Sequence, residues 1–178
     1  MTAVDATPEP RVVVGVSGTL GSLTALHRAA VEARRTGATL CAVLAWVPPG
    51  GELGHRDSAT PDLLAHCRRI AGEQLLDALD RAFGPSGPGV PLQALVVRGR
   101  PGPALVEAAG GSGDLLVVGA GTRGRLQRMV RPSVARYCLA HATCPVLAVP
   151  PSPLQRELDA VHRRVSWRLP LDVRELAD

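Results

Sequence analysis

The stretch from Asp114 to Pro150, DLLVVGAGTRGRLQRMVRPSVARYCLAHATCPVLAVP, decides the fold of this chain. An apolar run, Leu115 to Val118, leads into a glycine-rich loop, a basic segment, a helical pattern and a second apolar run. The first run predicts a strand buried on both faces, as in a parallel sheet. Gly119, Gly121 and Gly124 permit positive φ angles and a close approach of the backbone to an anion. This order of elements predicts an α/β domain with an anion-binding loop.

Ser133 stands where the helix of this stretch should begin. Its hydroxyl can cap that helix, and the free N–H groups around it can face a negative ligand. Four arginines lie in or beside the loop: Arg123, Arg125, Arg128 and Arg131. Either they are solvated, or at least one binds a phosphate through two parallel hydrogen bonds. A Walker-type triphosphate loop is excluded because the chain contains no lysine. Anion or nucleotide binding is therefore favoured over catalysis.

Strand and helix patterns alternate along the chain. Apolar runs predict strands at residues 12–16, 39–47, 92–97, 115–119 and 146–149. Helical spacing of apolar residues predicts helices at 20–35, 62–83, 104–109 and 133–141, with Gly37 ending the first. The alternation predicts an α/β fold, a five-stranded parallel doubly wound sheet of the flavodoxin or Rossmann-like type.

Residues 1–10 are expected to form a flexible N-terminal segment, and residues 151–178 a C-terminal extension with one helix. The extension carries an apolar seam at helical spacing, formed by Leu154, Leu158, Val161 and Val165. This seam is expected to dock on the domain or on a second copy of the chain.

Four segments carry a resemblance to a known family: RVVVGVSG (11–18), CAVLAWVPP (41–49), VVRGRPGPALVEAA (96–109) and SVARYCLAHATCPVLAVP (133–150). Together they make residues 11–150 similar, from end to end, to one domain of the universal stress protein family. The resemblance implies the strand order 3-2-1-4-5, in which the carboxyl ends of strands 1 and 4 form a ligand crevice. It also implies a cytoplasmic stress-response sensor that binds ATP or another adenine nucleotide, which Mg²⁺ can accompany.

The resemblance places the nucleotide at three points of the chain. Gly15, Val16 and Ser17 flank the ribose, and backbone groups near Val43 and Leu44 meet the adenine edge. The phosphates are held by residues of the loop and of the following helix start: Gly119, Gly121, Arg123, Gly124, Ser133 and Val134.

Three positions depart from the family's nucleotide-binding pattern. Thr122 and Pro132 stand where glycine is usual, and Pro132 has no amide hydrogen to donate to a phosphate. Ser17 stands where many members have aspartate, so its hydrogen bond to a ribose is weaker. A second hypothesis is therefore a degenerate member that acts as a dimeric interaction module without nucleotide. A slow nucleotide hydrolase comes last, because residues 11–24 and 117–135 contain no Asp, Glu or His to act as a general base.

Composition limits the remaining classes of partner. Only four of the 178 residues are aromatic and the net charge is +4, which argues against a nucleic-acid partner. No apolar run is long enough to span a membrane, so a cytoplasmic protein with no membrane partner is predicted. Four scattered cysteines predict reduced packing residues and no metal site. Residues 144–150 predict an edge strand that pairs in a homodimer or is covered by the C-terminal extension. A further protein partner is expected but unidentified.

Overall fold

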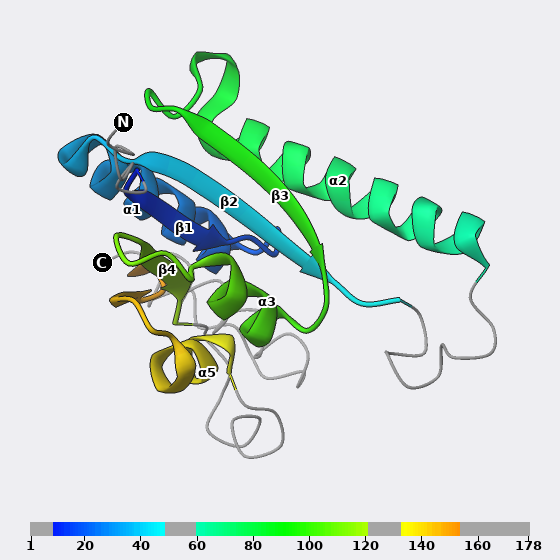
Figure 1. The fold of residues 1–178 in the computed structure, drawn as a ribbon. Helices are drawn as coiled ribbons and strands as arrows, with labels where there is room; N and C mark the ends of the chain where they lie inside the picture. The colour runs from blue at the N-terminus through cyan, green and yellow to red at the C-terminus, as the bar shows by residue number, and fades with distance from the viewer. Residues whose placement is uncertain (1–8, 49–59, 121–132, 154–178) are drawn as a thin grey trace, which may run out of the picture.

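A computed structural model of the protein describes residues 9–48, 60–120 and 133–153. Five strands form one sheet: β1 (Arg11–Gly15), β2 (Thr39–Trp46), β3 (Leu92–Arg98), β4 (Leu115–Gly119) and β5 (Val146–Val149). All neighbouring strands are parallel, in the order β3-β2-β1-β4-β5 (Figure 1). The predicted doubly wound sheet and its strand order are confirmed.

Helices connect the strands and cover both faces of the sheet. The described residues contain α1 (Leu20–Thr36), α2 (Pro61–Phe83), a 3₁₀ turn (Gly84–Ser86), α3 (Pro101–Ala108) and α5 (Val134–His141). One apolar cluster joins α1 and α2 to one face of the sheet, and a second cluster joins α3 and α5 to the other. The chain therefore crosses from one face to the other between α2 and α3.

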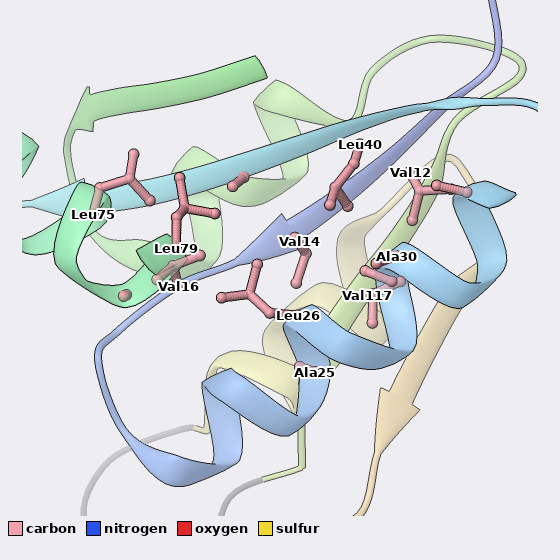
Figure 2. Close-up of a cluster of buried hydrophobic side chains, with 14 of the residues drawn as sticks. Val12, Val14, Val16, Ala25, Leu26, Ala30, Leu40, Leu75, Leu79 and Val117 are labelled. Carbon is pink, nitrogen blue, oxygen red and sulfur yellow. The ribbon is translucent and has the colours of Figure 1, made fainter. Parts of the chain in front are cut away.

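The alternation of side chains along β1 divides the core into these two clusters. Val12 and Val14 belong to the cluster on the α1 and α2 side, whereas Val13 belongs to the cluster on the α3 and α5 side. Figure 2 shows Leu26 of α1 and Leu79 of α2 on the side toward which Val14 and Val16 point. A strand buried on both faces is what the continuous apolar run of β1 predicted.

Two helix ends show how local sequence fixes the connections. Gly37 ends α1 in the left-handed region, with φ of 65°, as its position predicted. The helix predicted at residues 104–109 is α3, but α3 begins three residues earlier, at Pro101. Proline fits the first turn of a helix because no intrahelical partner exists there for the missing N–H.

A buried ion pair ties together the amino ends of β1 and β4. Arg11 Nη2 lies 2.6 Å from Asp114 Oδ2 and also donates to the Ala108 carbonyl oxygen at 3.1 Å. The Gly111 N–H donates to the same carboxylate at 2.9 Å, and the Asp114 side chain is only 3% exposed. Its hydrogen bond with Asp114 raises the pKa of Arg11. Asp114 therefore has a structural role, at the sheet end opposite the predicted crevice.

Candidate functional site

The carboxyl ends of β1 and β4 lie side by side, and the chain leaves them toward opposite faces of the sheet. Val12 to Val14 pair with Leu115 to Val117, so both strands end at the same edge. After β1 the chain enters α1 on one face, and α5 returns to β5 on the other. In doubly wound folds, ligands bind at this point of the sheet, outside the carboxyl ends of strands whose helices diverge.

Gly119 brings the two turns into direct contact. A Cβ atom at Gly119 would lie 2.9 Å from the Gly21 carbonyl oxygen and 3.8 Å from the Ser22 nitrogen. The end of β4 therefore packs against the first turn of α1. Gly15 is also confined, because a Cβ there would lie 2.7 Å from Leu105 Cδ1. Backbone packing alone accounts for glycine at position 119, with or without a ligand, whereas the Leu105 side chain beside Gly15 can move.

The turn after β1 is stabilised by short polar side chains. Gly18 has φ of 69°, a conformation that favours glycine. Thr19 caps α1: its Oγ1 accepts from the Ser22 N–H at 3.4 Å and lies 3.1 Å from Ser17 Oγ. Ser17 is exposed, so its hydroxyl can reach a ligand as well as Thr19. The cap was missed in the sequence, although Thr19 directly precedes a helical pattern, which is the usual signal.

The rim formed by β2 offers backbone groups rather than side chains. Val43 and Leu44 are buried, in the two opposite core clusters. The Val43 carbonyl oxygen already accepts from the Val16 N–H at 2.9 Å. In a parallel ladder alternate residues bond to the same neighbour, so Ala45 is the next residue whose backbone faces the crevice. No backbone hydrogen bond joins Ala45 to the described residues after β1. Ala45 was not singled out in the sequence.

Ser133 caps α5 as its position predicted. Its Oγ accepts from the Arg136 N–H at 3.1 Å, and Val134, partly buried, begins the helix. Because α5 ends at His141 and β5 starts beside Leu116, the helix runs opposite to the strands. Its N-terminus is therefore at the carboxyl edge of the sheet. Gly121, Arg123 and Gly124 lie outside the described residues, as do the divergent positions 122 and 132.

One cation of the described region approaches the turn after β1. A Cβ at Gly18 would lie 3.9 Å from Arg81 Nη2, and Arg81 forms an ion pair of 2.5 Å with Asp77 on the same helix. This contact could not be predicted from local sequence, because α2 is far from the turn along the chain. The described residues contain no group of three His, Cys, Asp or Glu side chains placed to hold a metal ion.

These features define a doubly wound α/β domain whose connections diverge to opposite faces of the sheet after β1 and β4. The chain belongs to the universal stress protein family, whose model matches residues 10–150. No curated protein matches it. No helix among the described residues combines the length and the apolar character that a membrane span requires.

Solved structures support the assignment of the fold. A universal stress protein in complex with cAMP is 25% identical, with a TM-score of 0.54 over 81% of this chain and 98% of that one. UspA from Lactobacillus plantarum is 20% identical, with a TM-score of 0.56 over 79% and 97% of the two chains. A family member from Burkholderia pseudomallei is 23% identical, with a TM-score of 0.54 over 81% and 97%. The last two show the fold alone.

Proposed function

We propose that this protein binds an adenine nucleotide in the crevice after β1 and β4 and serves as a cytoplasmic stress-response sensor. One observation carries the proposal: Gly119 packs on the first turn of α1, so the two turns that would enclose a ligand are already joined. The starts of α1 and α5 lie at this same edge, and helix starts favour anions. The relative solved with cAMP, at 25% identity, supports an adenine nucleotide as the ligand class.

Each part of the crevice suits a different part of the nucleotide. Ser17 and the backbone of Gly15 and Val16 would contact the ribose. The backbone beyond Val43 and Leu44, at Ala45, would meet the adenine edge. The phosphate side would be formed by the residues that follow β4: Gly119, Gly121, Arg123, Gly124, Ser133 and Val134. ATP, AMP and cAMP all meet these requirements, and with ATP a Mg²⁺ ion would be held mainly by the phosphates.

Binding would act on the folded chain in a simple way. A ligand that contacts the turns after both β1 and β4 stabilises their packed arrangement and so raises the melting temperature. The occupied and empty forms would then differ in the surface offered to a protein partner. We propose that the sensor is a homodimer through residues 144–150, since β5 is the last strand of the sheet.

A degenerate interaction module is the competing function. One glycine of the site, Gly119, is explained by packing against the Gly21 backbone alone. Ser17 already lies within hydrogen-bond distance of Thr19. In this alternative the fold and the dimer remain but the crevice holds no nucleotide. A Pro132→Gly substitution that creates binding absent from the natural chain would favour the alternative.

Calorimetric titration of the full chain with ATP, AMP and cAMP separates these functions. We expect micromolar binding of at least one of them. Ser17→Asp should bind more tightly, because a carboxylate accepts a stronger hydrogen bond from a ribose hydroxyl. Ser17→Asn, of the same size without the charge, is the matched control and should not. Absence of both heat and a thermal shift at millimolar nucleotide would exclude the sensor.

A further inference from the structure

A groove lies on the far side of the sheet from β5, between α2 and β3. Its volume is about 620 Å³. Its floor and wall are mainly apolar, with arginines around them, and its lining includes Trp46, Leu64, Ala94, Val96, Arg68 and Arg98. The groove is separate from the crevice, because no residue of the turns after β1 and β4 lines it.

One side of this groove is the open edge of β3. Among the described strands β3 pairs only with β2. The Leu40 N–H donates to the Pro91 carbonyl oxygen, and the Gly99 N–H donates to the Trp46 carbonyl oxygen. Odd-numbered residues of β3 therefore turn their backbone groups toward β2. The backbone groups of the even-numbered residues point away from the sheet: Leu92, Ala94, Val96 and Arg98.

The open edge and the groove share these residues. Ala94, Val96 and Arg98 line the groove, and no strand within residues 9–48, 60–120 and 133–153 pairs with their outward backbone N–H and C=O groups. Leu92 and Leu95 are each 39% exposed, so β3 also presents apolar surface on both faces. An open, apolar edge strand is a template for an added strand unless charge or a covering element protects it.

The charges around the groove specify the kind of strand that would be added. Arg69 is paired with Glu73 at 2.6 Å, but neither Arg68 nor Arg98 has a carboxylate partner among the described residues. Two unpaired cations beside an apolar floor complement a segment that carries both acidic and apolar side chains. A second copy of this chain, with a net charge of +4, complements them less well.

We propose that β3 receives an extended acidic and apolar segment of a partner protein by strand addition. The segment would pair with the outward backbone groups of Ala94 and Val96. Its alternate apolar side chains would enter the groove over Trp46 and Leu64, and its carboxylates would meet Arg68 and Arg98. In strand addition, backbone pairing supplies affinity and pockets for alternate side chains supply specificity. This site does not depend on the nucleotide crevice.

A peptide titration tests the proposal. The probe is a blocked peptide of alternating valine and glutamate, added to full-length protein that carries Trp167→Phe so that Trp46 is the one remaining tryptophan. We expect a saturable change in Trp46 fluorescence. Ala94→Pro should abolish it, because proline removes an outward N–H without touching the β2 ladder. Ala94→Ser keeps that N–H and should still bind. No binding at millimolar peptide overturns the proposal.

Charge reversal locates the site and does not depend on the proline variant. The double variant Arg68→Glu with Arg98→Glu should bind the valine–glutamate peptide about tenfold more weakly than the natural protein does. It should bind a valine–lysine peptide more tightly. Arg100→Gln, which changes an exposed arginine outside the groove, should leave both affinities unchanged. If the natural protein and the charge-reversed variant bind the valine–glutamate peptide with equal affinity, the proposed site is wrong. If Ala94→Pro instead abolishes self-association of the protein, the β3 edge pairs with a second copy of this chain.

Discussion

Because Gly119 has no side chain, the end of β4 can pack directly against the first turn of α1. Its position was predicted as a ligand-binding glycine, and a Cβ atom added there would lie 2.9 Å from the Gly21 carbonyl oxygen of α1. Both partners in the contact are backbone, so neither can rotate away. We expect Gly119→Ala to destabilise the protein by about 1–3 kcal/mol, as overpacked core substitutions do. Urea unfolding followed by circular dichroism measures the change.

Two other glycines serve as controls for Gly119→Ala. Gly72 lies inside α2 with nothing within 4 Å of a new Cβ, so Gly72→Ala should stabilise the protein by about 0.5–1 kcal/mol. Gly15→Ala would meet only the end of the Leu105 side chain, which can move. It should therefore cost less than Gly119→Ala. An unchanged stability in Gly119→Ala would mean that the two turns are not packed as described.

Cys138 predicts a loss of stability in alkaline solution. Its side chain is fully buried, and desolvation raises the pKa of the thiol from 9.0 to about 11. In the unfolded protein the Cys138 thiol releases its proton at a lower pH than in the folded protein. Its contribution to the free energy of unfolding is therefore fully present below about pH 9 and is lost between about pH 9 and 11. The full loss is about 3 kcal/mol, since each pKa unit corresponds to about 1.4 kcal/mol.

The test compares unfolding of the natural protein and Cys138→Ala from pH 8 to pH 11. The alanine variant is less stable at pH 8, but the difference between the two proteins should shrink as the pH rises. Alkylation by iodoacetamide gives a second readout. At pH 8 the partly exposed Cys67 should react and Cys138 should not. A constant difference across the pH range would contradict the raised pKa.

At the level of elements, predictions worked where a residue acts on its near neighbours. Ser133 and Gly37 were identified as helix boundaries because capping and left-handed geometry depend on adjacent backbone. The start of α3 was placed too late, because the proline-rich segment before Ala104 was interpreted as a break. The groups that Arg81 and Ala45 bring to the crevice were not predicted. They depend on how α2 and β2 lie against distant turns, which local sequence does not specify.

Ser133 has a structural role and a proposed ligand role, and two substitutions separate them. Ser133→Ala removes the acceptor for the Arg136 N–H and should cost about 1 kcal/mol of stability. It should also weaken nucleotide binding. Ser133→Asp keeps a capping oxygen and should retain stability, while its charge repels a phosphate. Thermal unfolding and calorimetric titration of both variants measure the two effects. Unimpaired nucleotide binding by Ser133→Asp would remove Ser133 from the phosphate site.

At the scale of the whole molecule, the five described strands leave two edge strands, β3 and β5, that pair with one neighbour each and have different properties. The edge at β3 adjoins a groove with unpaired arginines, whereas β5 is short and has its side chains partly buried. Strand order could be predicted because it follows from alternating strands and helices together with the family resemblance. Which partner covers each edge could not be predicted, because the strand patterns are alike and one of the two groove arginines, Arg68, comes from α2.

We predict that two copies of the chain pair through the outer edge of β5 to form a homodimer. The Leu116 N–H donates to the Pro145 carbonyl oxygen, and the Ala120 N–H donates to that of Val149. Odd-numbered residues of β5 thus bond to β4, and the backbone of Ala148 faces outward. Ala148→Pro removes an outward donor while the β4 ladder stays intact, so it should convert a dimer to a monomer. Sedimentation velocity measures the state, with Ala94→Pro on β3 as the matched control that stays dimeric. A dimer that survives Ala148→Pro but dissociates with Ala94→Pro would transfer self-association to the opposite edge.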